Sequence, residues 1–375
     1  MQISVLQENL AKGLNSVVKA IESRPPLPVL ANVLLEADES RLRIAASNLQ
    51  MSITVWIGAK VDRPGTITLP AKTFTDLVGR LSKERVDLLL DEATNTVTVR
   101  CGSTVSTIKG IASTEYPPIK QSDEAGIVVN AKALKSMILQ TAFAAAKEDN
   151  RPILTGVYTQ VDKDVLTLAA ADGYRLAVRT ARLDEALPKK AEMVIPARTM
   201  MEVARLMDDD NQPVSISLPN KNNIVTFRLP NVDISSQILE GRFPDFAAII
   251  PQRYITQSVI ETQDWLKKCQ TAEIFARDDA HSGRLIVKPP VTPGSPGEII
   301  VAGRSAERGH ADNSLDAHVE GEALDVHFDI RFLIEVLNVI DEDQVVFQSN
   351  GTDSPGVIRP QGREDFVHVI MPMTR

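Results

Sequence analysis

The chain has 375 residues, more than a single hydrophobic core usually holds, so two or three domains are expected. Hydrophobic residues make up 43 % and charged residues 24 % of the sequence, as in ordinary globular proteins. The formal net charge of −8 argues against a protein that coats nucleic acid by bulk attraction, but it allows a local basic lining.

The cysteines and the N-terminal residues indicate in which cellular compartment the protein is expected. The only two cysteines, Cys101 and Cys269, lack metal-ligand spacing and fit a reducing environment. The opening MQISVLQENL has neither a basic region nor a long apolar run, so it does not read as a signal peptide. No window reaches the roughly 18 consecutive apolar residues of a membrane helix. We therefore expect a cytoplasmic protein without a membrane partner.

The first third of the chain alternates helices and strands. The apolar spacing predicts an amphipathic helix over residues 7–22, with Leu10 and Leu14 inward and Lys12 and Lys19 on its polar side. Period-two alternation predicts strands at residues 1–5, 33–35, 42–45, 51–57, 86–90, 96–101 and 104–111. A strand and a second helix at residues 67–81 divide this region into two half-repeats.

The most informative stretch is Met193 to Asp210, MVIPARTMMEVARLMDDD. Pro196 is expected to open a helix at its first position, where a missing N–H costs nothing. Four apolar residues then recur at helical spacing and predict a buried face, namely Met200, Val203, Ala204 and Met207. Arg198 and Arg205 share another face, on which we expect no acidic residue between them.

Two further stretches repeat this pattern. In ITLPAKTFTDLVGRL, residues 67–81, Lys72 occupies the position of Arg198, and Arg80 follows on the same helix. In VHFDIRFLIEVL, residues 326–337, Arg331 occupies that position. Basic residues at one phase of three equivalent helices are expected to face a common direction.

The remaining elements complete a threefold duplication. Helices at residues 132–146 and 265–275 follow short strands, and Leu10, Leu134 and Trp265 are equivalent. The segment 45–53 (AASNLQMSI) matches 170–178 (AADGYRLAV) at an offset of 125 residues. We predict an α+β protein of three tandem domains, at residues 1–122, 126–252 and 256–375.

Residues 288–298 (KPPVTPGSPGE) are expected to form an exposed loop, and the acidic, histidine-bearing residues 307–322 are expected to form another.

No catalytic constellation is evident. The sequence has no P-loop and no nucleophile elbow. His310, Asp312, His318 and His327 lie in one stretch, but their spacing fits no metal-ligand pattern. Asp208-Asp209-Asp210 follows a helix end and is typical of a solvated turn. We expect a binding or scaffolding protein without a metal or cofactor.

Four motifs in order carry a resemblance to a known family. They are SRPPLPVLANVLL at 23–35, ADGYRLAV at 171–178, EGRFPDF at 240–246 and the terminal VIMPMTR at 369–375. Over its whole length the chain resembles the bacterial sliding clamps, the beta subunits of DNA polymerase III.

The resemblance implies a head-to-tail homodimeric ring around duplex DNA, with helices lining the hole and sheets outside. It implies a non-catalytic processivity subunit of the polymerase holoenzyme in DNA replication. Its partners would be the DNA polymerase III alpha subunit, the clamp-loader delta subunit, and other polymerases and repair proteins with clamp-binding motifs. The DNA-facing residues would be Lys12, Lys19, Arg24, Lys72, Arg80, Arg198, Arg205 and Arg331, together with the segment 148–153.

The resemblance also implies two protein-binding sites. A peptide pocket would comprise Leu154, Gly173, Tyr174, Arg175, Leu176, Pro244, Val369, Ile370, Met371, Pro372 and Met373. A dimer interface would include Phe74, Ile274 and Phe275. The residues alone leave alternatives open, because 369–373 also reads as a last buried strand and Phe275 also reads as a core residue. Ala171, Ala248 and Thr374 depart from residues found in some relatives and affect the rim of the pocket.

Two other classes stand beside this reading. A metal-dependent nuclease or polymerase-like enzyme would use the acidic residues 307–322. A protein-binding scaffold without DNA would require the shared phase of the basic residues to be accidental.

Overall fold

The structure is a computed structural model, and it describes residues 1–148, 150–207, 212–219, 221–292 and 295–373. The chain divides into two compact units, of which unit 1 comprises residues 1–132 and 202–238, and unit 2 comprises residues 133–201 and 239–375. Asp208, Asp209, Asp210 and Thr374 lie outside the described residues. No helix among the described residues is long and apolar enough to cross a membrane.

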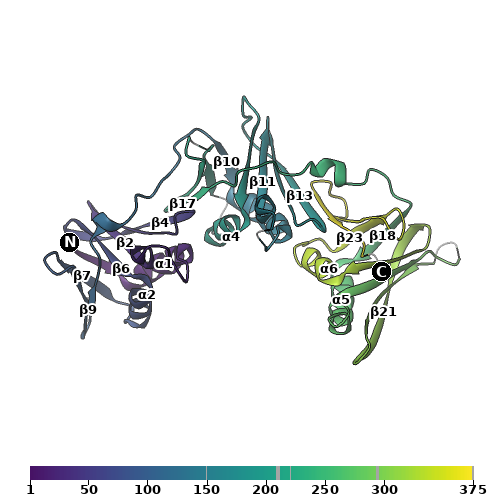
Figure 1. The fold of residues 1–375 in the computed structure, drawn as a ribbon, viewed down its shortest axis with the longest axis horizontal. Helices are drawn as coiled ribbons and strands as arrows, with labels where there is room; N and C mark the ends of the chain where they lie inside the picture. The colour runs from purple at the N-terminus through teal and green to yellow at the C-terminus, as the bar shows by residue number, and fades with distance from the viewer. Residues whose placement is uncertain (149, 208–211, 220, 293–294, 374–375) are drawn as a thin grey trace. The chain divides into compact units, whose positions relative to one another are not determined.

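Unit 1 contains two antiparallel sheets (Figure 1). The sheet of order β5-β1-β7-β8-β9 is built from β5 (Lys60–Arg63), β1 (Gln2–Leu6), β7 (Arg85–Asp91), β8 (Thr96–Cys101) and β9 (Thr104–Lys109). The sheet of order β10-β15-β16-β17-β4-β3-β2-β6 is built from β10 (Ile127–Asn130), β15 (Pro213–Ile216), β16 (Ile224–Leu229), β17 (Val232–Gln237), β4 (Met51–Gly58), β3 (Arg41–Ser47), β2 (Asn32–Asp38) and β6 (Gly65–Pro70).

Unit 2 contains one continuous sheet of twelve strands, of order β14-β11-β12-β13-β25-β24-β23-β18-β21-β20-β19-β22. Its strands are β11 (Gly156–Asp162), β12 (Val165–Ala171), β13 (Arg175–Arg182), β14 (Ala191–Pro196), β18 (Thr256–Glu261), β19 (Ser282–Lys288), β20 (Gly297–Ser305), β21 (Gly309–Gly321), β22 (Leu324–Asp329), β23 (Gln344–Ser349), β24 (Gly356–Pro360) and β25 (Phe366–Ile370).

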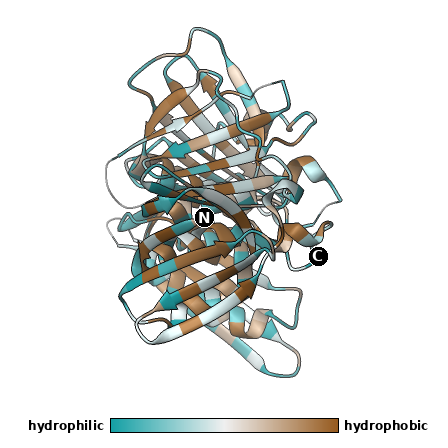
Figure 2. Ribbon diagram, turned by 90° about the vertical axis from the view of Figure 1, so that its left-hand side faces the viewer, coloured by the Kyte–Doolittle hydropathy of each residue, from teal (hydrophilic) through white to brown (hydrophobic). Residues whose placement is uncertain are grey.

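Six α-helices accompany the sheets among the described residues, and they are α1 (Gln7–Val17), α2 (Ala71–Arg80), α3 (Ala131–Thr141), α4 (Ala197–Leu206), α5 (Thr262–Ala276) and α6 (Ile330–Leu337). Hydrophobic and hydrophilic residues are interspersed along the strands in Figure 2, and burial alternates residue by residue in strands such as β7. In unit 1, α1 packs on β4 and on α2, with Leu10 and Leu14 completely buried. Gly13 permits α1 to approach the sheet, because a Cβ there would lie 2.9 Å from Ile44 Cδ1 on β3.

The expected elements are present, with shifted ends. The first helix stops at Val17 and continues as a 3₁₀ turn over Val18–Ala20, so Lys19 lies in that turn. Pro70 is the N-cap of α2 and Pro196 ends β14, so neither proline is the first helical residue as predicted. Helix ends commonly move by one residue between definitions.

Two predicted loops differ from the structure. Most of residues 307–322 form β21, whose Leu315, Ala317 and Val319 alternate inward, so the acidic stretch is a strand and not a loop. Of the loop predicted at residues 288–298, Lys288 belongs to β19 and residues 297–298 belong to β20, while residues 293–294 lie outside the described part of the chain.

The duplication is visible in two equivalent turns, which also correct its offset. Asn48 N donates to Met51 O over 3.1 Å, and Asp172 N donates to Arg175 O over 3.3 Å. The side-chain oxygen of Asn48 or Asp172 accepts from the backbone N–H groups two and three residues further on. Asn48 and Asp172 are therefore equivalent, so this stretch has an offset of 124 residues and not 125.

Candidate partner and nucleic-acid interfaces

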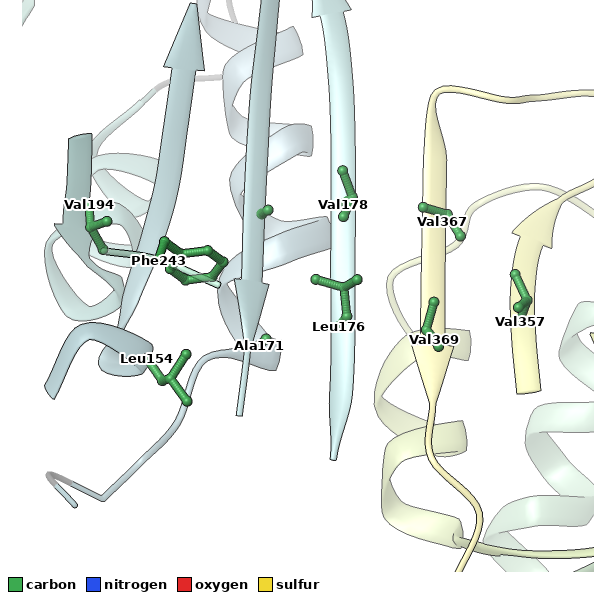
Figure 3. Packing of buried hydrophobic residues seen from close by; sticks show 10 residues of the cluster. Leu154, Ala171, Leu176, Val178, Val194, Phe243, Val357, Val367 and Val369 are labelled. Carbon is green, nitrogen blue, oxygen red and sulfur yellow. The ribbon is translucent and has the colours of Figure 1, made fainter. Parts of the chain in front are cut away.

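The predicted peptide pocket lies where β13 and β25 pair in unit 2. Their ladder places Leu176 opposite Val369 and Val178 opposite Val367. Together with neighbouring strands these residues form an apolar group that we call the junction cluster (Figure 3): Leu154, Ala169, Ala171, Leu176, Val178, Val194, Phe243, Val357, Val367 and Val369. Segments far apart in the sequence thus share one buried hydrophobic cluster.

Partly exposed apolar side chains surround the junction cluster. Ile153, Leu239 and Phe246 pack against it while remaining half-buried. The Tyr174 side chain is 68 % exposed and that of Met371 is 41 % exposed, and Met371 N donates a hydrogen bond to Tyr174 O over 2.8 Å. Large apolar groups of this kind, adjacent and accessible, are typical of sites that bind protein segments.

The turn that presents Tyr174 has a left-handed residue, Gly173, and its equivalent in unit 1, Leu49, also has a positive φ, of +76°. Gly173 has φ of +96°, a left-handed conformation that side chains with a Cβ rarely adopt. The Asp172 carboxylate closes the turn by accepting from the backbone N–H of Tyr174 over 2.9 Å. The turn therefore holds Tyr174 outward beside the junction cluster.

The Arg175 side chain is buried beneath the Tyr174 turn, where it forms hydrogen bonds and ion pairs within the chain. Its Nε donates to Asp172 Oδ2 over 3.0 Å, its Nη2 donates to Phe143 O over 2.9 Å, and its Nη1 pairs with Glu335. The guanidinium also lies 4.2 Å from the centre of the Phe332 ring. A buried charge requires such paired and hydrogen-bonded surroundings, and through them Arg175 joins β13 to α6.

A second ion-pair group secures the same pair of strands further along. Arg179 pairs with Asp365 and donates from Nη1 to Thr180 O over 2.9 Å. Asp365 also accepts from Arg363 Nε over 3.0 Å, and Arg363 pairs with Glu342. Burial of Arg179 lowers the pKa of its guanidinium, although Asp365 opposes that shift.

The eleven residues predicted for the pocket thus have different placements. Leu154, Leu176, Val369 and Ile370 are buried, and the last two belong to β25, so that part of the terminal segment is indeed a buried strand. The accessible ones are Gly173, Tyr174, Pro244 and Met371, with Pro372 and Met373 half-buried. Phe243, Phe246 and Val357 were not predicted, although both phenylalanines stand in the quoted motif EGRFPDF.

The equivalent junction in unit 1 is polar. There β4 pairs with β17, which places Ser52 opposite Ser235 where unit 2 has Leu176 opposite Val369. Thr226 hydroxyl bonds to that of Ser235 over 3.0 Å and accepts from the backbone N–H of Ser122 over 2.8 Å. Ser122 is completely buried, so the chain's own connecting segment covers this face with hydrogen bonds.

All eight cations predicted to face DNA are exposed: Lys12, Lys19, Arg24, Lys72, Arg80, Arg198, Arg205 and Arg331. Six of them lie on α1, α2, α4 and α6. The expectation that no acid lies between Arg198 and Arg205 is wrong, because Glu202 Oε2 accepts from Arg205 Nε over 2.6 Å. Arg331 likewise pairs with Asp329 over 2.6 Å.

The three residues predicted for the dimer interface also differ. The Phe74 side chain is completely buried within the chain, which contradicts its assignment as an interface contact. Ile274 is 50 % exposed on α5, and Phe275 is half-buried. Ile274 is therefore the accessible apolar residue of the set.

Over the part of the chain that the structure describes, no group of three or more histidine, cysteine, aspartate or glutamate residues has the geometry to hold a metal ion. His310, Asp312 and His318 lie along β21, and His327 lies on the separate strand β22. Cys101 and Cys269 are both buried free thiols.

Three duplicated α+β domains with this succession of strands and helices define the class of DNA-clamp proteins. Models of the N-terminal, central and C-terminal domains of the DNA polymerase III beta subunit match residues 1–120, 128–245 and 247–374. The chain belongs to this family, the beta sliding clamps, and it has the family's function as the processivity factor of DNA polymerase III.

Similar proteins span the same length. The beta sliding clamp of Bacillus subtilis is 29 % identical, with 100 % of this chain and 99 % of that protein covered; that of Staphylococcus aureus is 28 % identical with the same coverage. The crystal structure of the Bacillus subtilis sliding clamp has a TM-score of 0.94 at 27 % identity, covering 100 % of this chain and 99 % of that one. The DNA polymerase III beta chain of Streptococcus pneumoniae has a TM-score of 0.92 at 27 % identity, covering 100 % of both chains.

Family membership decides between the classes considered from the sequence. The chain is a non-catalytic polymerase subunit, so the metal-dependent nuclease is the wrong alternative. DNA and a polymerase are the partners that the family implies, which also disfavours a scaffold without DNA.

Proposed function

We propose that two copies of the chain close head to tail into a ring around duplex DNA, with the cationic helices toward the DNA. The observation that carries this proposal is the repeated placement of Lys72, Arg198 and Arg331 at one phase of α2, α4 and α6, all exposed. An overall charge of −8 keeps DNA from the remaining surface, so the cations act locally.

Weak contacts suit such a ring. Lysine and arginine contacts to phosphates hold DNA without reading sequence, and they weaken as salt rises. Base contacts worth about 1–3 kcal/mol each would stop the protein at particular sequences. A closed ring needs no strong contact, because its topology prevents dissociation.

The first experiment measures retention on circular duplex DNA. We expect the double variant Lys72→Glu with Arg198→Glu to be retained less than the wild type. Its salt dependence should be shallower, by about 0.9 in the log–log slope for each phosphate that the protein no longer neutralises. The matched control replaces Lys189 and Lys221, which are exposed outside the helices and strands, with glutamate. Equal retention of the helix variant and the control would refute the DNA-facing assignment.

We also propose that the junction cluster and its rim, Tyr174, Pro244 and Met371, bind the clamp-binding motifs of partner proteins. Expected partners are the DNA polymerase III alpha subunit, the clamp-loader delta subunit, and other polymerases and repair proteins. A flexible methionine beside aliphatic residues provides a surface that several peptides can share. The polar, self-covered junction of unit 1 supports one such site per chain.

The second experiment measures binding of a clamp-binding peptide from the alpha subunit. Tyr174→Ala and Met371→Ala are expected to weaken binding by about tenfold or more each, as truncation of a buried interface anchor does. Tyr254→Ala is the matched control, because Tyr254 is also an exposed tyrosine and lies outside the junction cluster. Deleting the chain from Val369 onward is unsuitable, since it removes part of β25. Unchanged affinity in both rim variants would refute the site.

Two coarser expectations accompany this function. We place the protein in the cytoplasm, where the replication machinery of a bacterium works. We also propose domain limits at 1–122, 126–252 and 256–375, which lie close to the spans matched by the three family models.

A further inference from the structure

Unit 1 contains a cavity of about 660 Å³, and two of the cations expected to face DNA, Lys12 and Arg205, are among its lining residues. It lies between α1, the end of β4, the turn joining β16 to β17, and the end of α4. Its volume falls in the range of about 300–1,000 Å³ that is typical of small-molecule sites.

The lining of the cavity is cationic. Lys12 contributes its side chain from α1 and Arg205 contributes its side chain from α4, whereas no aspartate or glutamate is among the described residues that line it. Lys12 and Arg205 are the charged side chains among the described lining residues, and Glu202, which pairs with Arg205, is not in the lining. An anionic ligand is the one that this charge favours.

Arg205 is held in place before any ligand arrives. Its Nε donates to Glu202 Oε2 over 2.6 Å, and its Nη2 donates to Ser16 O over 3.2 Å. These bonds use two of the five N–H donors of a guanidinium. A positioned guanidinium loses little conformational freedom when it binds a phosphate, and its planar fork suits phosphate oxygens.

An aromatic ring and several amides complete the lining. Trp56 is half-buried at the cavity, and its backbone N–H donates to Asn231 O over 3.1 Å, which fixes the strand end that carries it. Indole faces stack on nucleobases, a contact worth about 1–3 kcal/mol per base. Asn9, Asn15 and Asn231 supply amide groups that can both donate and accept hydrogen bonds.

We infer that this cavity binds a nucleotide, with the phosphate on Lys12 and Arg205 and the base against Trp56. The nucleotide is either a free nucleoside monophosphate or one unit of a single strand of DNA. Only the second source rests on the proposed function, because a free nucleotide would bind whether or not the chain encircles duplex DNA.

Intrinsic fluorescence provides a direct test, because the chain has two tryptophans. Trp265 is completely buried in unit 2, so a ligand in the cavity reports through Trp56. We expect thymidine monophosphate to quench the tryptophan fluorescence of the full-length protein in a saturable way. The substitution Trp56→Phe is expected to abolish this quenching. Thymidine without phosphate is expected to bind at least about tenfold more weakly, since it lacks the charge-assisted hydrogen bonds.

Variants separate the cavity from general surface charge. Lys12→Gln and Arg205→Gln are each expected to weaken the binding of thymidine monophosphate by about tenfold. Lys72→Gln, an exposed lysine at a helix outside the cavity, is expected to bind like the wild type. Absence of saturable quenching, equal binding of thymidine and its monophosphate, or equal binding by the Lys12 and Arg205 variants would each overturn the inference.

A binding experiment with a short oligothymidylate distinguishes a free nucleotide from a single DNA strand as the ligand. If it binds more tightly than the monophosphate, a single DNA strand is the ligand; if it does not quench while the monophosphate does, the free nucleotide is. Failure of nucleotide binding with normal retention on circular duplex DNA overturns this inference alone. Failure of retention with normal nucleotide binding overturns the proposed ring alone.

Discussion

His368 is a buried histidine whose surroundings favour its neutral form. It lies on β25, its ring centroid is 5.4 Å from that of Phe143, and neither ring nitrogen has a hydrogen-bond partner among the described residues. Burial lowers the pKa of its imidazole from 6.5 to about 3, with a further contribution from the positive charge of Arg175. The unfolded chain therefore binds a proton between these values that the folded chain does not.

This predicts a specific loss of stability in acid. Because the unfolded state binds more protons below pH 6.5, the free energy of unfolding falls as the pH falls, by about 2 kcal/mol between pH 7 and pH 5. His368→Leu should remove this component, so its melting temperature should fall less than that of the wild type over the same range. His318→Gln is the control, because His318 is exposed. Parallel pH profiles of wild type and His368→Leu would contradict the prediction.

At the scale of single residues, the sequence predicted the exposed cations but not the contacts that hold them. The positions of Lys72, Arg198 and Arg331 followed from the repeats alone. The pairing of Arg175 with Glu335 joins residues 160 apart in the sequence, and no local pattern encodes such a distance. The family resemblance placed Arg175 in the peptide pocket, but the sequence did not indicate that its side chain is buried and paired.

At the scale of elements, α2 illustrates how a correct helix can carry a misassigned residue. Apolar spacing places Phe74 on the same face as Val78, and both are completely buried. The helical periodicity identifies this buried face, but it does not indicate whether the face packs against the same chain or against a second chain. The fold shows that the chain itself provides the cover.

We therefore expect Phe74→Ala to destabilise unit 1 and to leave no specific defect at an interface. Truncation of a buried phenylalanine costs about 3–5 kcal/mol, because it removes packing and leaves a cavity. Chemical denaturation measures the loss, and Thr73→Ala, at the exposed neighbour, is the control. A variant of normal stability that fails to dimerise would restore Phe74 to the interface.

Strands were predicted less completely than helices for a related reason. The stretch 309–321 alternates inward apolar and outward polar residues, but its charges and histidines suggested a loop. The pairing of β13 with β25 and of β4 with β17 joins separate repeats. Such long-range pairing depends on tertiary structure, whereas the alternation within each strand is local.

At the scale of the whole molecule, the stability of the proposed ring depends on the contact between two chains as well as on the folding stability of each chain. Ile274 is half exposed on α5 and is the accessible apolar residue among the three predicted for the dimer interface. We expect Ile274→Glu to increase the monomer fraction in sedimentation at micromolar concentration, because a charge buried at an interface is costly. Its melting temperature should remain close to that of the wild type when both are compared as monomers.

An exposed apolar residue elsewhere on the chain supplies the control. Val128→Glu changes a residue that is 59 % exposed on β10 and should leave the monomer fraction unchanged. If the Ile274 and Val128 variants sediment alike, Ile274 lies outside the contact between chains.

The strand ladders within each chain also determine where a closed ring can yield. The pairing of β4 with β17 and of β13 with β25 runs over five residue pairs in each case, so parting either would break several backbone hydrogen bonds together. In the proposed ring, the contacts between two chains would lack such a ladder within one polypeptide. We therefore expect a protein that opens the ring to separate two chains and to leave the β4–β17 and β13–β25 pairings intact.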